Sequence, residues 1–464
     1  MSPSLDAKRL RRGTDLGDGV DVRTFQSPIH RIPPEMLAEI FVCCLPESRL
    51  PRTHPLEAPL LLSQVSSVFR STALSTPTLW SGIRIKTVKA RREHCLTLGL
   101  WISRSGSSPL SFSFRYEKGN NSNVAIDELI RILAPHSRRW KHVGITFFQD
   151  YVTSVFIEAV ARGIPNLEIL TIDPSYDRMA QLCNDRLVLS SAHHLKEINI
   201  SVLVLIDLGT SLLPSVKRIC FRGRNMSYSL GRSLYFLDHC PSIEEFTLNL
   251  FGTSGDLGAF GDQVKIRHLP FLRDLNIIAT EGHAGPFFDH LCVPSLRKLT
   301  FYGHERAGLD PGQGPHQPSW ASMIGMFKRS NAPLQELRLD GSCVSEADLV
   351  ECLQCIPRLK YLEYVDLYRT GMIVKVLELN SPNALCLELE VIVLTSYSLN
   401  VSTFVNMVSS RWDGSRSDAG LGKAGGRCLK KIVVEGRHDE TIINEPTLAK
   451  FVSEGLEMEL RVGD

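Results

Sequence analysis

The sequence contains no run of 18 or more apolar residues, the length that predicts a membrane-spanning helix. The best candidates, residues 202–206 and 384–394, have the length of a strand, and the second contains two glutamates. No apolar segment follows the basic cluster at residues 8–12, so a secretory signal is not indicated. These absences predict a soluble intracellular chain, located in the cytoplasm, the nucleus or both.

Motifs that carry catalysis are also missing. The chain has no G-x-x-x-x-G-K-[ST] phosphate loop, no G-x-G-x-x-G opening a helix, no H-E-x-x-H and no G-x-S-x-G elbow. His193 and His194 have no carboxylate or cysteine at ligand spacing. We therefore expect no enzyme, no cofactor and no metal. A cryptic enzyme on an α/β fold is the alternative, and it requires titratable residues gathered in one pocket.

Charge and cysteine are equally uninformative about a ligand. The formal charge of +2 is close to balance, which argues against a dedicated nucleic-acid binder with a broad basic face. Twelve cysteines are scattered without a disulfide framework, and free buried thiols are expected. Cys352 and Cys355 form the only C-x-x-C pair, and without a second pair nearby they do not predict a zinc site.

At 464 residues the chain is too long for one compact core, so two or more units or an elongated repeat array are expected. Residues 1–27 are rich in Ser, Asp, Gly and Arg and sustain neither a helical nor a strand period, which predicts a flexible leader. Its basic cluster is either a nuclear import signal or a solvated tail.

A helical pattern begins abruptly after this leader. Pro34 suits the first position of a helix, where the missing N–H costs nothing, and Glu35 stands in the first turn, where the helix dipole favours a carboxylate. Leu37, Ile40 and Phe41 are spaced i, i+3 and i+4, which predicts one apolar stripe. A proline-rich break, a second apolar segment at 60–74 and a short turn at 76–80 follow.

Residues 28–82, about an eighth of the chain, resemble the F-box motif. The shared features are I-P-P-E-M-L at 32–37, I-F at 40–41, L-S-Q-V at 62–65, F-R at 69–70 and T-P-T-L-W at 76–80. The similarity is strongest to a fungal group whose F-box opens with P-I-H-R, an apolar residue and P-P-E, as at 28–35 here. The sequence departs from this pattern in its longer segment 46–58, and in Ser66 and Phe69, which stand where cysteine and tryptophan are common.

The resemblance implies a partner. F-box helices pack on a Skp-type adaptor, which links them to cullin and RING subunits, through apolar residues that a small helical cluster leaves uncovered. The alternative is an ordinary three-helix bundle whose apolar stripes only pack on each other. The adaptor-contacting residues implied here are Ile32, Pro33, Pro34, Glu35, Leu37, Ile40, Phe41, Val65, Phe69, Leu79 and Trp80.

From residue 140 onward the pattern apolar-x-x-apolar-x-apolar recurs eleven times. It starts at Trp140, Leu167, Leu195, Val216, Ile243, Leu272, Leu296, Leu334, Leu359, Leu389 and Leu429. Successive starts are 21 to 40 residues apart, and a similar L-x-x-L-x-L pattern on a period of 20–29 is typical of leucine-rich repeats. The ninth position is neither Asn nor Cys in any occurrence, so we expect an irregular solenoid of alternating strands and helices.

The segments between these strands have helical patterns, as at 152–161, 229–239 and 346–354, and a proline often precedes the next strand. Residues 83–139 are a linker or capping repeat, with a helix expected at 91–103, a strand at 110–114 and a helix at 126–133. Segments 303–319 and 409–427 are rich in Gly with Pro, Ser or Arg and predict surface loops, which either contact a target or are tolerated insertions.

Together these patterns predict an α/β chain with a leader (1–27), an F-box (28–82), a linker or capping repeat (83–139) and a leucine-rich-repeat-like array (140–464). The predicted function is the substrate-recognition subunit of an SCF-type cullin-RING ubiquitin ligase, with an unknown target protein and no nucleic-acid or membrane partner. The alternative is an adaptor-bound F-box protein with a scaffold role that does not lead to degradation.

Overall fold

A computed structural model describes most of the chain. The described residues are 28–87, 92–116, 123–148, 152–174, 186–202, 204–222, 230–250, 265–280, 284–304, 319–340, 344–365, 371–379, 385–395, 399–413, 429–436, 442 and 445–461. The predicted leader, its basic cluster, and most of the two predicted loops (305–318 and 414–427) lie outside them.

The N-terminal unit is helical. It consists of η1 (Pro28–Arg31), α1 (Pro34–Cys43), α2 (Leu62–Val65), α3 (Ser67–Leu74) and η2 (Pro77–Trp80). Strands and helices then alternate: β1 (Gly82–Thr87), α4 (Arg92–Arg104), β2 (Leu110–Tyr116), α5 (Val124–Leu133), η3 (Ala134–Arg139), β3 (Trp140–Phe147), α6 (Ser154–Ala161), β4 (Ile169–Pro174), β5 (Arg186–Val188), β6 (Glu197–Ile200), β7 (Leu205–Asp207) and β8 (Arg218–Phe221).

The second half continues the alternation. Its elements are α7 (Leu230–His239), β9 (Glu245–Leu250), β10 (Arg267–His268), β11 (Asp274–Thr280), α8 (Ala284–Asp289), β12 (Leu291–Cys292), β13 (Lys298–His304), α9 (Ser319–Ser330), β14 (Glu336–Asp340), α10 (Glu346–Gln354), β15 (Tyr361–Val365), α11 (Gly371–Val376), β16 (Val391–Thr395), α12 (Val401–Asp413), β17 (Lys431–Glu435), α14 (Pro446–Ser453) and β18 (Glu457–Arg461).

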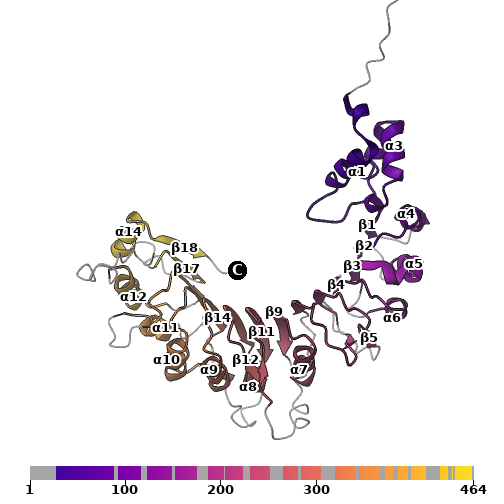
Figure 1. Ribbon diagram of the computed structural model, residues 1–464. Coiled ribbons are helices and arrows are strands. Elements are labelled where there is room, and N and C mark those ends of the chain that lie inside the picture. The colour runs from indigo at the N-terminus through magenta and orange to yellow at the C-terminus, as the bar shows by residue number, and fades with distance from the viewer. Residues whose placement is uncertain are drawn as a thin grey trace, which may run out of the picture.

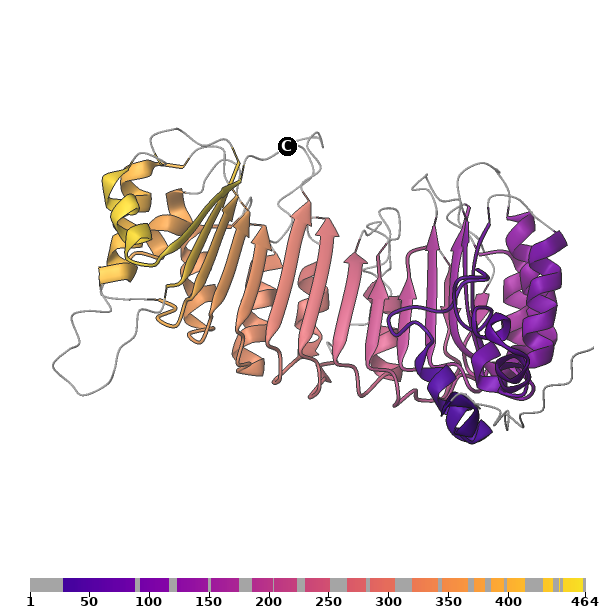
Figure 2. The same cartoon turned by 90° about the horizontal axis from the view of Figure 1, so that it is seen from above.

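Fourteen of these strands form one parallel sheet in the order β1-β2-β3-β4-β6-β8-β9-β11-β13-β14-β15-β16-β17-β18. The sheet bends into an open arc whose outer side carries the helices, and the N-terminal unit stands at one tip (Figure 1). Figure 2 shows the strands side by side with the helices behind them. The short pairs β5–β7 and β10–β12 form two separate small sheets. The predicted α/β class is thus confirmed as a mixed fold with a large parallel sheet.

The recurring apolar pattern lies in register across this sheet. Its second positions form one continuous row from β3 to β17, which Phe112 extends onto β2: Val143, Leu170, Ile198, Ile219, Phe246, Leu275, Leu299, Leu337, Leu362, Ile392 and Ile432. Every member of the row is at most 1% exposed, beneath the helices. Each such burial contributes roughly 1.5–3 kcal/mol, so the row is a main source of stability.

The helices predicted from periodicity are present, and their ends shift by at most two residues. One predicted loop, in contrast, is partly helical. Residues 409–413, assigned to a loop from their composition, are instead the last turn of α12. Arg411 in this turn is only 5% exposed. The composition suggested an exposed loop, but Ser410 and Arg411 of this turn are buried and form hydrogen bonds inside the protein.

Arg411 shows how neighbouring layers are joined. Its guanidinium donates to the backbone oxygens of Leu377 (2.7 Å), Leu385 (2.9 Å) and Cys386 (3.0 Å), in the connection before β16. Arg329 in α9 donates in the same way to the oxygens of Phe288 (2.7 Å) and Leu291 (3.1 Å). Since a connection between helix and strand leaves carbonyls without backbone partners, a long arginine from the next helix satisfies them.

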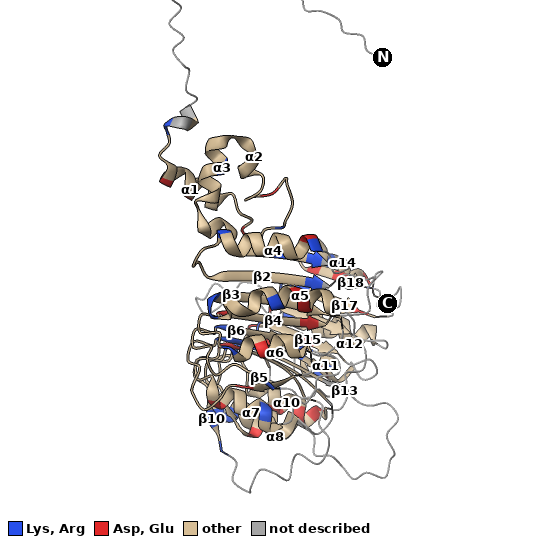
Figure 3. Cartoon of the chain, turned by 90° about the vertical axis from the view of Figure 1, so that its right-hand side faces the viewer, with Lys and Arg blue, Asp and Glu red and all other residues tan. Residues whose placement is uncertain are grey.

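A second set of contacts pairs charges along the rim where the strands begin. Glu168 lies between Lys141 (3.6 Å) and Lys196 (2.8 Å), and Glu390 lies between Lys360 (3.6 Å) and Lys430 (2.7 Å). Lysines and arginines are visible along this rim beside β3 and β6 (Figure 3). Opposite charges on adjacent strands favour the observed register, although each exposed pair contributes only a few tenths of a kcal/mol to about 1.

Candidate docking surface

Helix α1 carries two parallel apolar stripes. Pro33 precedes the helix in an extended conformation (φ −53°, ψ 143°) and Pro34 opens it, so the prolines fix the direction of its first turn. Leu37 and Phe41 face inward and are 3% and 1% exposed. Met36 and Ile40, one position earlier in each turn, face outward and are 57% and 45% exposed.

The inward stripe of α1 packs on α3 and η2. The ring centroids of Phe41 and Phe69 are 4.9 Å apart. Ser66 caps α3, since its hydroxyl accepts a hydrogen bond from the Phe69 N–H at 3.1 Å. Trp80 is fully buried, and its indole N–H donates to the Ala73 oxygen at 2.7 Å. The core of this unit is therefore closed by its own aromatic side chains.

The N-terminal unit is joined firmly to the sheet. The rings of Trp80 and Trp101 (α4) lie 4.8 Å apart, and the Arg104 guanidinium lies 4.4 Å from the Trp80 ring. The indole N–H of Trp101 donates to the Gly82 oxygen at 3.1 Å, at the start of β1. Because aromatic and cationic contacts from three elements meet here, the helical unit is held in one orientation relative to β1.

The long segment 46–58 adds a second connection. Its Pro51 oxygen accepts a hydrogen bond from the Arg84 N–H at 2.8 Å, at the free edge of β1. The Glu57 carboxylate holds the segment closed, accepting from Arg49 (2.7 Å) and from the Arg52 backbone (2.8 Å). The hydrogen bond from Arg49, with those from Arg52, lowers the pKa of Glu57 to about 2. We call this structure, residues 49–57 with β1, the bracket.

The N-terminal unit exposes an unusually large number of apolar side chains. Eight of the seventeen exposed large apolar side chains in the described part of the chain belong to it. This N-terminal apolar set comprises Ile29, Met36, Ile40, Leu56, Leu61, Val65, Val68 and Leu74. Isolated exposed apolar residues are common, but such a concentration in one small unit marks a site of interaction.

The predicted adaptor residues divide into three groups. Pro33, Pro34, Glu35, Ile40 and Val65 are exposed and available to a partner. Ile32 and Phe69 are partly buried against the core. Leu37, Phe41, Leu79 and Trp80 are at most 3% exposed. The prediction that these four contact an adaptor directly is corrected, because they fill the core of the unit and are not accessible in this structure.

Sequence reasoning missed several members of the apolar set, notably Met36, Leu61 and Val68. A signal was present for one of them: Met36 and Ile40 are spaced i, i+4, as are Leu37 and Phe41. A helix buried on one side only needs one such stripe. The ten-residue α1 carries two adjacent stripes, and the unit buries only one of them.

No protein-family model matches the chain. A search of curated proteins also finds no match.

Catalytic and metal-binding alternatives find little support in the described residues. There, no group of three or more His, Cys, Asp or Glu side chains is placed to hold a metal ion. Cys352 of the C-x-x-C pair is fully buried, and burial raises the pKa of its thiol. A thiol held in the neutral form is a poor nucleophile and a poor metal ligand. None of the described helices has the length and apolar character needed to cross a membrane.

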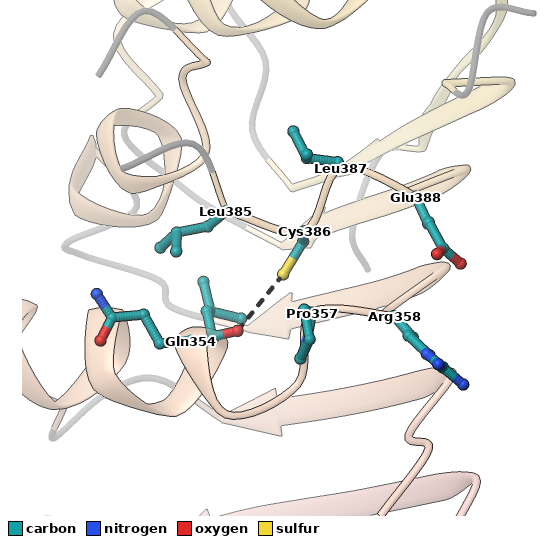
Figure 4. Close-up of a pocket in the computed structure, with 8 residues that line it drawn as sticks. Gln354, Pro357, Arg358, Leu385, Cys386, Leu387 and Glu388 are labelled. Atoms are coloured by element: carbon teal, nitrogen blue, oxygen red, sulfur yellow. Dashed lines mark hydrogen bonds between the residues drawn. The ribbon is translucent and has the colours of Figure 1, made fainter. Parts of the chain in front are cut away.

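One surface cavity of about 490 Å³ lies between the end of α10 and the segment before β16 (Figure 4). It is lined by Leu353, Gln354, Pro357, Arg358, Leu385, Cys386, Leu387 and Glu388. The Cys386 thiol points to the Leu353 oxygen at 4.0 Å. Arg358 and Glu388 are both exposed, and neither forms an ion pair with a described residue. The cavity shows no arrangement of a nucleophile with a base.

Proposed function

We propose that this chain is the substrate-recognition subunit of an SCF-type cullin-RING ubiquitin ligase. In this proposal residues 28–82 are an F-box that docks on a Skp-type adaptor, which recruits cullin and RING subunits. The parallel sheet and its helices are an irregular leucine-rich-repeat-like solenoid that binds a target protein. The chain itself contributes no catalytic residue.

The N-terminal apolar set is the observation that carries the proposal. Each of its side chains would gain roughly 1–2 kcal/mol on moving from partial exposure to full burial under a partner. Association costs an estimated 4–15 kcal/mol or more, so a stable complex requires several such residues together. The unit offers eight, in the same segment that carries the F-box pattern.

The solenoid part of the proposal is supported by the order of the sheet. Each strand pairs with its predecessor and successor along the chain, apart from the two small side sheets, and helices lie between most strands on the outer side. Such a chain grows along one axis and presents a long inner surface. A long inner surface is suited to holding a protein target.

A receptor of this kind works by proximity. It raises the effective concentration of a target lysine near a conjugating enzyme that the other subunits carry. This requires a fixed geometry between the adaptor and the target. The bracket and the Trp80–Trp101 contact would supply it, because they hold the helical unit against β1.

Co-purification with a Skp-type adaptor tests the proposal. We expect the purified chain to bind the adaptor, and the complex to recruit cullin. Adaptor binding without cullin recruitment would support the alternative scaffold role instead. If the folded chain does not bind the adaptor, both the ligase role and the scaffold role are refuted.

A further inference from the structure

The inner face of the sheet changes its chemistry along the arc. In each strand the residues that alternate with the buried ones point to this face. From β2 to β13 its central row consists of small, uncharged residues: Ser113, Gly144, Thr171, Asn199, Cys220, Thr247, Asn276 and Thr300. From β14 onward the row changes to Arg338, Glu363, Val393, Val433 and Glu459. From β2 onward, charged side chains thus first enter this row at β14.

A cluster of hydrogen-bonded aromatic residues lies at this change. The Glu363 carboxylate on β15 accepts hydrogen bonds from the hydroxyls of Tyr302 on β13 and Tyr361 on β15, both at 2.8 Å. The Arg338 guanidinium on β14 lies 3.2 Å from the same carboxylate and 5.1 Å from the centre of the Tyr361 ring. Burial, and then the hydrogen bond to Glu363, raise the pKa of Tyr361 to about 12.

Two partly exposed valines extend this cluster. Val391 stands directly opposite Tyr361 in the β15–β16 register, and Val365 follows two residues after Glu363 on the same face. We call Tyr302, Arg338, Tyr361, Glu363, Val365 and Val391 the inner patch. Its tyrosines are the only tyrosine, phenylalanine or tryptophan residues at inner-face positions of the described strands of the main sheet. Tyrosine and arginine held in one conformation are typical of the residues that dominate binding at protein interfaces.

Charge differs between the two ends of the inner face. On β14 to β18 it presents the carboxylates Glu336, Asp340, Glu363, Glu435, Glu457 and Glu459 and the cations Arg338, Lys431 and Arg461, a net charge of −3. On β1 to β4 it presents Arg84, Lys86 and Arg115 against Asp173, a net charge of +2. A basic partner is therefore attracted to the end that carries the inner patch.

We propose that the inner patch binds an extended segment of a partner protein in which a lysine or arginine stands next to an apolar side chain. The apolar side chain would lie over Val391, and the cation would lie near the Tyr361 ring and the Glu336 carboxylate. Glu336 stands opposite Tyr361 in the register, is 44% exposed, and contacts Lys298 only at 3.8 Å. The inference rests on the proposed function, because it specifies the target class of the proposed receptor.

A random twelve-residue peptide library displayed on phage, selected against the purified full chain, tests the inference. We expect enrichment of peptides in which Lys or Arg adjoins Leu, Ile, Phe or Tyr. A synthetic copy of one selected peptide, measured by fluorescence anisotropy, should bind Glu336→Lys and Tyr361→Ala about tenfold more weakly than the unmodified chain. Arg115→Ala, an exposed charge at the far end of the same face, is the control and should change the affinity less than twofold.

Several results would overturn the inference. The selection could yield acidic or uncharged peptides, or no enrichment above background. The affinity could also be unchanged in Glu336→Lys, a substitution that should not affect folding because the Glu336 side chain is exposed. Tyr361→Phe keeps the ring in case the alanine variant does not fold, and it should retain most of the affinity. Adaptor binding, measured separately on the unmodified chain and on each variant, distinguishes the two proposals. If no form binds the adaptor but the peptide preference is intact, the ligase and scaffold roles are refuted and the inference about the inner patch stands.

Discussion

The outward stripe of α1 and its neighbour Val65 provide a quantitative test of adaptor docking. The triple variant Met36→Ser, Ile40→Ser, Val65→Ser removes three side chains that are 57%, 45% and 59% exposed. About half of each side chain remains to be buried by a partner, which is worth about 1 kcal/mol per residue. The sum of about 3 kcal/mol predicts a dissociation constant about a hundredfold weaker for a Skp-type adaptor. Isothermal titration calorimetry of the full chain measures it.

The chain offers a matched control for this variant. Leu96 and Leu100 on α4 are 60% and 53% exposed and lie outside the N-terminal unit. Leu96→Ser with Leu100→Ser should leave the affinity for the adaptor within about twofold, a free-energy change of less than 0.5 kcal/mol. The two variants should unfold at similar temperatures, close to that of the unmodified chain, since each removes side chains that are about half exposed. A triple variant that binds within threefold of the unmodified chain, or a control that weakens binding equally, would falsify the docking argument.

Three further predictions concern the fold. Arg411→Met leaves three buried carbonyls without their donor and should lower the free energy of unfolding by about 3 kcal/mol. The surface control Arg358→Met should change this free energy by less than about 0.5 kcal/mol, and denaturant titration measures both. Glu57 has a folded pKa of about 2 against 4.5 unfolded, so its contribution is complete above pH 4.5 and is lost as the pH falls towards 2. The stability difference between the unmodified chain and Glu57→Gln should therefore shrink over that range, and a difference that grows on acidification contradicts the bracket. Iodoacetamide should label exposed Cys43 rapidly and buried Cys352 only on unfolding, which peptide mass mapping detects.

The positions of the strands could be predicted from the sequence because the information is local. An apolar residue at every second position allows a strand only one buried side, so each recurrence of the pattern marks a strand directly. Leu337 and Leu339 of β14 illustrate this, since both are fully buried while Glu336 and Arg338 between and beside them are not. The helical period of 3.6 residues is equally local, and it located α10, whose observed bounds agree with the sequence pattern.

The N-terminal unit shows where local information ends. The spacing of Leu37, Ile40 and Phe41 suggested one apolar stripe, but Ile40 lies outside the core that receives the other two. Which stripe is covered depends on Phe69 and Trp80, which are distant in the sequence and reach α1 only through the folding of the whole unit. The extent of the exposed set, including Leu61 and Val68, was decided by the same contacts.

The sequence by itself determined the α/β class, the strands of the recurring pattern and most of the helices, because each depends on neighbours within a turn or a strand. Only the tertiary structure decided that β1 and β2 extend the sheet before residue 140 and that Pro51 covers its edge. It also placed Tyr302, Arg338 and Glu363 in one cluster although 61 residues separate the first from the last. The physical reason is that burial and hydrogen bonding are settled between strands, and the pairing of strands joins residues far apart in the chain.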